Sequence, residues 1–278
     1  MRVFQDSEHE LIVTRIIETG FAVVQRNDRI AELYEQIFRA GREFFSRVPA
    51  EKARLHPAAG RNLGYRPVGE EYSIDASIPD IKESITYVPS ERASAADQPA
   101  DARSLYALMR SAVDSLDPLC LGIMRALARR YASKDPIYAA ADSQLALNYY
   151  PVARSPHDVL IQPHEDGCLI TVLASTDSGL ELRLRSGEFR PCDEVIEHLV
   201  IVAGVSLTIA TGGAIPPAFH RVVRRPLVSE RLTIAYDATA DLHRSIPPWV
   251  VNEGEAVRKL DEEARLTLTR FGLPPLGR

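Results

Sequence analysis

The stretch from Val159 to Ala174 reads VLIQPHEDGCLITVLA. Its two ends are rich in Val, Ile, Leu and Thr, which predicts two short strands, Val159–Asp166 and Leu169–Ala174, joined by a turn. Side chains two positions apart on a strand point to the same face, so His164 and Asp166 are expected to converge on one point. An imidazole and a carboxylate that converge in this way are typical of a metal site.

Short apolar runs of the same kind occur throughout residues 142–240, separated by Gly, Pro, Ser or Asp turns. About eight such strands in sequence favour a double-sheet jelly roll over alternating strands and helices. Besides the two strands above, the predicted strands are Leu145–Tyr150, Leu180–Leu184, Leu199–Ala203, Ser206–Thr211, Ala218–Arg224 and Arg231–Asp237. We therefore predict a mostly β fold with flanking helices (α+β) around a double-stranded β-helix (jelly-roll) core.

The residues before this core carry helical patterns. After a short strand at residues 20–24 and a capping Asn27, apolar residues recur at spacings of three and four and predict a helix; they are Ile30, Leu33, Ile37, Ala40 and Phe44. A second helical block spans Pro99–Lys134, where Pro118 is expected to kink or divide the helix. Between the two blocks, Pro57–Pro89 has no clear period and is predicted to be a long surface excursion.

We expect residues 1–278 to form a single domain with three parts. These are a mainly helical N-terminal part (1–141), the jelly-roll core (142–240) and a C-terminal part (241–278). A charged amphipathic helix over Asn252–Phe271 is predicted to close the C-terminal part. The hydrophobic content of 45% supplies ample material for a buried core.

Charge and composition limit the partners. A formal net charge of −5 argues against a nucleic-acid partner, because phosphate binding needs a basic face. No stretch approaches the roughly 20 apolar residues that cross a bilayer, and the polar N-terminus does not resemble a signal peptide. Three widely spaced cysteines, Cys120, Cys168 and Cys192, predict reduced thiols in a cytoplasmic protein. Nothing in the sequence predicts the oligomeric state.

A third metal ligand is available in His220, which follows His164 by 56 residues. That gap is long enough for several strands to return the chain to the first two ligands. Two histidines and one carboxylate on one face leave coordination positions open, as oxygen chemistry on Fe(II) requires. We predict that His164, Asp166 and His220 are the metal ligands and that Cys168 is a core thiol.

Two further pairs support an oxygen-chemistry site. Arg231 and Thr233 share one face of a predicted strand, and together they offer a guanidinium fork and a hydroxyl to a carboxylate. Asn148 and Tyr150 share a face near the end of the first core strand.

The chain resembles the isopenicillin N synthase-like branch of the Fe(II)/2-oxoglutarate-dependent oxygenases in several motifs that occur in order. They are Gly20–Val24, Phe44-Phe45 with Pro49–Lys52, Gly64-Tyr65, Gly69–Glu71, Pro79–Glu83, the Asn148–Pro151 sequence NYYP, the ligand strand His164–Leu173, and Phe219–Val222. The chain departs from the family in lacking the usual opening strand. It also has Thr233 where the family has Ser, which keeps the hydroxyl.

The resemblance implies roles for particular residues. His164, Asp166 and His220 would bind Fe(II) and act in catalysis through it. Arg231 and Thr233 would hold the distal carboxylate of 2-oxoglutarate, with Asn148 and Tyr150 lining the cosubstrate side. With O2, such enzymes oxidise a small-molecule substrate by hydroxylation, desaturation or cyclisation and release succinate and CO2.

Three other functions remain open from the residues. Within the family, the chain could be a 2-oxoglutarate-independent oxidase of the isopenicillin N synthase type. Outside it, the alternatives are a non-catalytic jelly-roll binding protein and a Zn(II) hydrolase or isomerase on a similar barrel.

The expected substrate is an amino acid, a peptide or a specialised metabolite, as is usual in the family. The lid and pocket walls are expected from Asn62–Val88 and from the closing helix. Arg66, Arg221 and Arg224 are candidates to recognise an acidic group.

Overall fold

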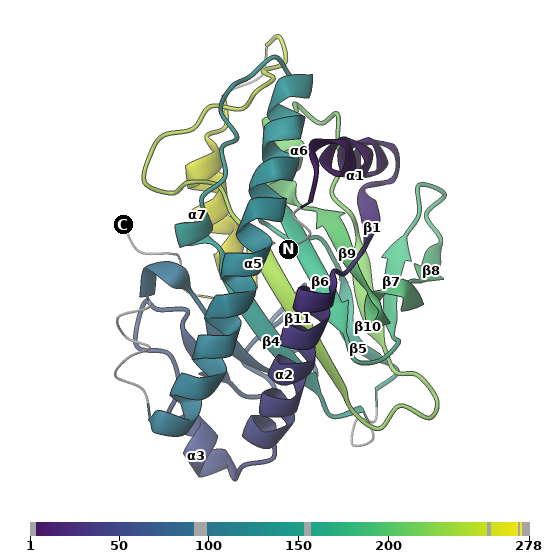
Figure 1. Ribbon diagram of the computed structural model, residues 1–278. Coiled ribbons are helices and arrows are strands. Elements are labelled where there is room, and N and C mark those ends of the chain that lie inside the picture. Colours follow the sequence, from purple (N-terminus) through teal and green to yellow (C-terminus); the bar gives the residue numbers. More distant parts are fainter. Residues whose placement is uncertain (1–3, 92–98, 153–156, 255–256, 272, 274–278) are drawn as a thin grey trace.

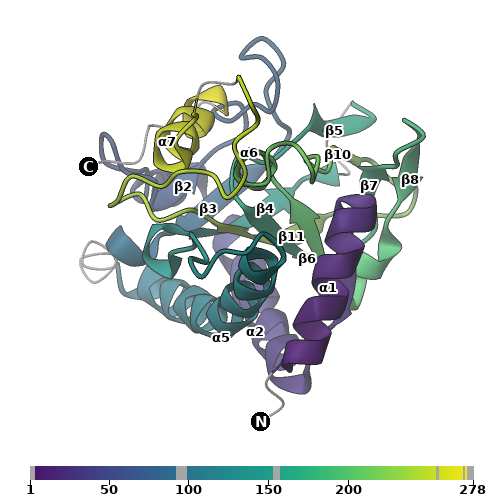
Figure 2. The same ribbon diagram turned by 90° about the horizontal axis from the view of Figure 1, so that it is seen from above.

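A computed structural model describes residues 4–91, 99–152, 157–254, 257–271 and 273. Two antiparallel sheets lie face to face (Figures 1 and 2). The larger sheet has the strand order β1-β9-β6-β11-β4-β3-β2, and the smaller has the order β5-β10-β7-β8. The strands are β1 (Phe21–Gln25), β2 (Gly64–Arg66), β3 (Glu83–Tyr87), β4 (Gln144–Tyr150), β5 (Val159–His164), β6 (Ile170–Ser175), β7 (Leu180–Arg183), β8 (Phe189–Pro191), β9 (His198–Ala203), β10 (His220–Val223) and β11 (Arg231–Ala238). This arrangement confirms the predicted jelly roll with flanking helices.

Helices cover the outer face of the larger sheet. In Figures 1 and 2, α2 and the long α5 lie across this face, with α1 beside β1 and α7 at the opposite side. The helices are α1 (Asp6–Thr19), α2 (Asp28–Phe45), α3 (Pro49–Ala53), α5 (Ala100–Arg130), α6 (Val205–Ala210) and α7 (Leu260–Arg270), with short 3-10 helices η1 (Pro89–Glu91), η2 (Ala140–Asp142) and η4 (Asp193–Ile196). Within the described residues, no helix is long and apolar enough to span a membrane.

Helix α2 packs closely on the sheet because its sequence permits a short approach. Asn27 caps the helix, its side chain accepting a hydrogen bond from the backbone N–H of Ile30 at 2.9 Å. A Cβ at Gly41 would lie 2.6 Å from Leu147 of β4 and 2.9 Å from Leu232 of β11. Gly41 therefore allows the helix to rest directly on the two strands that line the site on their other face.

Two predictions about secondary structure were wrong, and a third was wrong in one of its two alternatives. Residues 206–211 belong to helix α6 and the turn after it, not to a strand. The alternation in Val-Ser-Leu-Thr-Ile-Ala resembles a strand, but the Thr208 hydroxyl bonds the carbonyl of Gly204 one helical turn earlier. The surface excursion Pro57–Pro89 instead contributes β2 and β3, and β3 pairs with β4. Pro118 does not divide α5.

Strand alternation in β11 separates the core from the site. Leu232, Ile234 and Tyr236 belong to the hydrophobic core, whereas Arg231 and the alternate residues after it line a cavity between the sheets. The same strand therefore packs against the helices on one side and presents polar groups to the cavity on the other.

Candidate metal centre

The two candidate histidines meet through strand pairing. Strand β10 runs antiparallel to β5, and His220 lies directly opposite His164 in this register. Asp166 follows in the loop immediately after β5. The 56-residue separation is thus closed by one cross-strand pair.

The ligand atoms of these three residues converge. His164, Asp166 and His220 each offer one ligand atom, and these atoms all lie within 4.8 Å of one another. Asp166 Oδ1 is 3.6 Å from His164 Nε2 and 3.8 Å from His220 Nε2. Two imidazole nitrogens and one carboxylate oxygen form the donor set that Fe(II) accepts in a facial arrangement.

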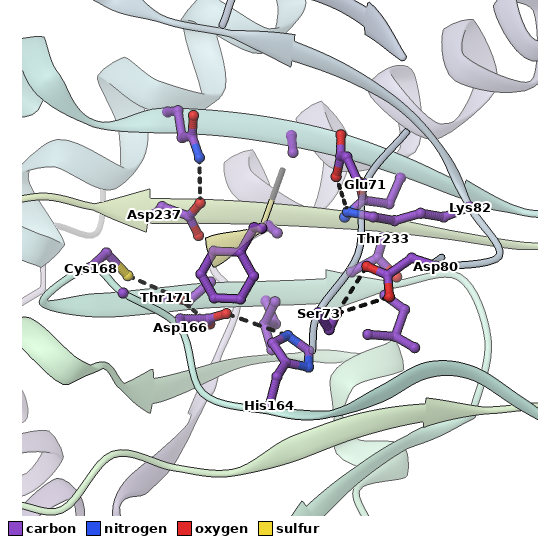
Figure 3. Close-up of a pocket in the computed structure, with 18 of the residues that line it drawn as sticks. Glu71, Ser73, Asp80, Lys82, His164, Asp166, Cys168, Thr171, Thr233 and Asp237 are labelled. Carbon is purple, nitrogen blue, oxygen red and sulfur yellow. Dashed lines mark hydrogen bonds and ion pairs between the residues drawn. The ribbon is translucent and has the colours of Figure 1, made fainter. Parts of the chain in front are cut away.

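Backbone carbonyls orient both imidazole rings. His164 Nδ1 is 2.8 Å from the carbonyl oxygen of Gln162, and His220 Nδ1 is 3.1 Å from that of Ala218. Each carbonyl accepts a hydrogen bond from Nδ1–H, so the Nε2 lone pair of each ring is directed to the shared point. The Thr171 hydroxyl donates to Asp166 Oδ2 (Figure 3), which leaves Oδ1 facing the histidines.

Helix α6 holds the loop that carries Asp166. The backbone N–H of Val205 donates to the Asp166 carbonyl at 2.8 Å, and the Ser206 hydroxyl donates to the Gly167 carbonyl at 2.6 Å. A Cβ at Gly204 would lie 2.2 Å from the carbonyl oxygen of Cys168 and 2.9 Å from that of Asp166. The loop can pack this closely only because residue 204 has no side chain.

The electrostatics of the site keep its ligands ready for a cation. Burial, with a contribution from His220, lowers the pKa of His164 to about 4, so this imidazole is neutral at neutral pH. Burial alone would raise the pKa of Asp166, but His220, His164 and the Thr171 hydrogen bond together hold it below its ordinary value. Metal binding therefore does not have to displace a proton from His164 or Asp166 at neutral pH.

Arg231 lies in the same cavity as the triad. Its side chain is 1% exposed, its Nε donates to the Asp177 carbonyl at 3.2 Å, and its guanidinium lies 5.0 Å from the centre of the Tyr150 ring. Buried Arg231 Nη1 and Asn148 Oδ1 have no hydrogen-bond partner in the structure. Unpaired buried polar atoms are costly, so they fit a polar ligand in this cavity.

The remaining predicted site residues divide into two groups. Asn148, Tyr150 and Thr233 line the cavity with Arg231. Arg66, Arg221 and Arg224 do not line it, and they interact with nearby groups of the chain: Arg66 with Asn62, Arg221 with Glu181 and Arg224 with Asp158. Cys168 is buried beside Thr171 and lies outside the cluster of candidate metal ligands.

Several lining residues were not predicted from the sequence. Lys82 and Glu71 form an ion pair at 2.5 Å, and Gln144 Nε2 donates to Asp237 Oδ2 at 2.8 Å. Their positions can be followed in Figure 3, where Asp237 and the Lys82–Glu71 pair lie across the cavity from His164. At the end of α7, the ring of Phe271 packs edge-on against His164, with ring centres 6.1 Å apart. Both segments that were expected to form the pocket walls therefore line the cavity. Asn62–Val88 contributes Lys82, and the C-terminal segment contributes Phe271.

A protein-family model and a known relative both match this chain. Residues 141–239 match the 2OG-Fe(II) oxygenase superfamily. Gibberellin 20 oxidase 3 from Oryza sativa subsp. japonica is 26% identical over 254 residues, which cover 84% of this chain and 69% of the rice protein.

Two solved structures share the fold. A Caulobacter crescentus protein assigned to the 2OG-Fe(II) oxygenase family is similar with a TM-score of 0.75, 22% identity and coverage of 95% of this chain and 94% of that one. A full-length Neurospora crassa protein in complex with 2-oxoglutarate (alpha-KG) and thymine also has a TM-score of 0.75, with 21% identity and coverage of 93% and 89%.

The family match covers residues 141–239, which include the three candidate metal ligands, and the fold of the chain fits the isopenicillin N synthase-like branch. The chain is an enzyme that uses Fe(II), 2-oxoglutarate and O2 to oxidise a small molecule. This match favours an Fe(II) oxygenase over the zinc hydrolase and the non-catalytic binding protein. The direct oxidase belongs to the same family, and cosubstrate binding distinguishes it from a 2-oxoglutarate-dependent enzyme.

Proposed function

We propose that His164 Nε2, His220 Nε2 and Asp166 Oδ1 bind Fe(II), and that Arg231 binds the distal carboxylate of 2-oxoglutarate. One observation carries this proposal: three converging ligand atoms share a cavity with a buried, unpaired guanidinium N–H. A dicarboxylate that extends from the triad to Arg231 satisfies both ends of the cavity.

The residues around Arg231 complete the cosubstrate site. The Tyr150 ring lies against the guanidinium and limits its movement, and the Thr233 hydroxyl lies next to Arg231 on the same face of β11. Thr233 Oγ1 is 3.3 Å from Ser175 Oγ, and the Ser175 hydroxyl donates to the Leu232 carbonyl at 2.8 Å. The Thr233 hydroxyl can therefore donate its proton either to Ser175 or to a bound ligand. Asn148 lies opposite Thr233 in the strand register and contributes a buried amide.

When bound together, Fe(II) and 2-oxoglutarate supply the oxidising chemistry, in which O2 is consumed and succinate and CO2 are released. The protein has three tasks in this reaction. It holds the ligands through Thr171 and the two backbone carbonyls, it holds the distal carboxylate through Arg231, and it restricts water by burying the site between the sheets.

The substrate in this proposal is an amino acid, a peptide or a specialised metabolite that is hydroxylated, desaturated or cyclised. Enclosure of the site between two sheets, with Phe271 over His164, supports a small molecule. The Neurospora crassa structure was determined with thymine, a molecule of this size class.

Metal binding tests the triad directly. Under anaerobic conditions, Asp166→Ala should lose tight Fe(II) binding in equilibrium dialysis, because it removes the anionic ligand. Asp158→Ala, whose side chain is 87% exposed, is the matched control and should bind Fe(II) like the wild type. Tight iron binding by Asp166→Ala would contradict the assignment.

Cosubstrate binding tests Arg231 separately. Arg231→Ala should keep Fe(II) affinity but weaken 2-oxoglutarate binding about 10- to 100-fold, the usual effect of removing hydrogen bonds to a charged group. Arg224→Ala is the control, since Arg224 pairs with Asp158 outside the cavity. Equal 2-oxoglutarate affinity in Arg231→Ala and Arg224→Ala would argue against this role.

A further inference from the structure

Strands β4 and β11 present a row of cross-strand pairs to the cavity, and the two ends of this row carry different chemical groups. One end carries the guanidinium and its neighbours, two alanines lie in the middle, and a carboxylate and an amide lie at the far end. The pairs are Tyr150–Arg231, Asn148–Thr233, Ala146–Ala235 and Gln144–Asp237.

Asp237 lies at the opposite end of this row from Arg231, the proposed partner of the cosubstrate's distal carboxylate. Asp237 follows Arg231 by six positions, which is about 20 Å along an extended strand. A five-carbon diacid cannot engage Arg231 and also occupy the cavity at Asp237. The alanine pair between them leaves room above the sheet because its side chains are small. The Asp237 end of the row is therefore available to a second molecule.

Asp237 also lies beside the metal centre. It is opposite Thr171 of β6 in the strand register, and Thr171 donates to Asp166. Asp237 Oδ2 accepts a hydrogen bond from Gln144 Nε2. Within the described chain, no Lys, Arg or His forms an ion pair with Asp237. A group bound to this carboxylate would be held next to the site of oxidation.

The charges of the lining residues limit what can bind there. Among the described lining residues, Lys82 and Arg231 are the Lys and Arg side chains. Lys82 is paired with Glu71, and Arg231 is assigned to 2-oxoglutarate. Asp80 and Asp237 add carboxylates that form no ion pair within the described chain, although the charge of Lys82 acts on both; Asp80 accepts from the Ser73 hydroxyl at 2.9 Å. A substrate carboxylate would thus meet no available cation, whereas a hydrogen-bond donor would meet acceptors.

The ionised form of Asp237 is costly in the folded protein. Burial and the nearby Asp166 raise its pKa to about 7. A buried carboxylate with one amide partner does not contribute to packing as an apolar residue would, so its position in a ligand cavity favours a binding role.

We propose that Asp237, supported by Gln144, recognises the substrate, and that the substrate donates an N–H group to this carboxylate and carries no carboxylate of its own. Of the substrate classes given above, this leaves specialised metabolites with an N–H group and excludes free amino acids and unblocked peptides. The inference rests on the proposed function, because it assumes that 2-oxoglutarate occupies Arg231. Two kinds of compound share this chemistry, a cationic amine and a neutral N–H heterocycle. Matched probes distinguish them.

The test uses the full chain loaded anaerobically with Fe(II) and 2-oxoglutarate, and pairs of small probes. Benzylamine is compared with benzoate, and thymine with N,N′-dimethylthymine, which lacks N–H donors. Binding is followed by the paramagnetic relaxation that iron causes in the NMR signals of each probe. The N–H donor of at least one pair should bind more tightly than its partner, and the pair that responds identifies the amine or the heterocycle.

The variant Asp237→Asn keeps the shape of the side chain and removes its charge. It should weaken binding of the preferred donor about 10- to 100-fold while leaving Fe(II) and 2-oxoglutarate affinities unchanged. Asp158→Asn, which alters an exposed carboxylate, should change none of these values.

Each other result contradicts the inference. Preference of the loaded protein for benzoate, or the failure of both donors to bind, would overturn it while leaving the proposed function intact. Loss of iron affinity in Asp237→Asn would make Asp237 a support for the metal ligands instead. A wild-type protein that binds neither Fe(II) nor 2-oxoglutarate would overturn the proposed function, and this inference with it.

Discussion

At the scale of single residues, Asp166 divides its two carboxylate oxygens between two kinds of partner. Oδ2 accepts a hydrogen bond from Thr171, and Oδ1 faces both histidine Nε2 atoms. In the proposed iron site, this arrangement presents one oxygen to the metal. A single carboxylate oxygen and two imidazoles leave positions for 2-oxoglutarate and O2.

Asp237 provides a prediction about pH and stability. Its pKa in the folded, metal-free protein is raised from 3.8 to about 7, so the folded state holds a proton that the unfolded chain releases. The stabilisation from this group is present below the unfolded pKa and is lost as pH rises through about 7. Asp237→Asn should therefore be more stable than the wild type near pH 8, by about 1 kcal/mol or more.

The measurement is chemical denaturation of metal-free protein at several pH values. The difference in the free energy of unfolding between Asp237→Asn and the wild type should shrink as the pH falls toward about 5, where the wild-type carboxyl is protonated. His164 has a lowered pKa and has the opposite effect, losing stability as the medium is acidified, but both proteins contain it. A wild type as stable as Asp237→Asn at every pH would contradict the account of this carboxylate.

Residues of the site differ in how far the sequence could predict them. His164 and Asp166 share one short motif, and Arg231 and Thr233 share another, so spacing alone proposed them. Thr171 and Gln144 act through neighbouring strands, and no spacing along the chain reveals which strands pair. Asp237 did carry a signal, because it continues the alternation that begins at Arg231.

At the scale of elements, the short helix α6 supports the metal loop, the segment after β5 that carries Asp166, Gly167 and Cys168. Its first residues bind the carbonyls of Asp166, Gly167 and Cys168. A strand had been predicted here because Val, Leu and Ile alternate with polar residues. The alternation was misleading, since one side of this segment packs in the core through Leu207 and Ala210 while its beginning holds the loop.

Gly204→Ala tests this support. The added Cβ would lie 2.2 Å from a backbone oxygen of the metal loop, which must move to accommodate it. We expect Fe(II) affinity to fall about 10- to 100-fold, as for other changes that disturb the support of metal ligands. Anaerobic Fe(II) titration measures the change.

Gly41→Ala is the matched control for this substitution. Its Cβ would meet the side-chain ends of Leu147 and Leu232 on the helical face of the sheet. It should cost about 1–3 kcal/mol of stability through overpacking and leave the iron affinity of the folded protein unchanged. Equal effects of the two substitutions on iron affinity would show that general destabilisation, not the loop, is responsible.

At the scale of the whole molecule, the fold places the reaction between two sheets with different roles. The smaller sheet supplies His164 and His220, whereas the larger supplies Arg231 and the row that ends at Asp237. Helices α2 and α5 cover the outer face of the larger sheet, and α7 lies at its side (Figures 1 and 2). Iron and 2-oxoglutarate would therefore connect the two layers.

The class of fold could be predicted because it depends on strand number and on the alternation within each strand. The strand order could not, because β1, β2 and β3 join the larger sheet from the mainly helical N-terminal part. In β3, Ile85 lies opposite Leu147 of β4. The sequence around Ile85 has no clear period, so it forms a strand because it pairs with β4, a segment distant in the chain.

The most direct test of the central claim is the visible charge-transfer band of 2-oxoglutarate chelated to Fe(II), recorded without O2. The wild-type protein should develop the band on addition of 2-oxoglutarate, and Arg231→Ala should need about 10- to 100-fold more cosubstrate to reach it. Iron that binds tightly to the wild type without producing the band at saturating 2-oxoglutarate would contradict the account.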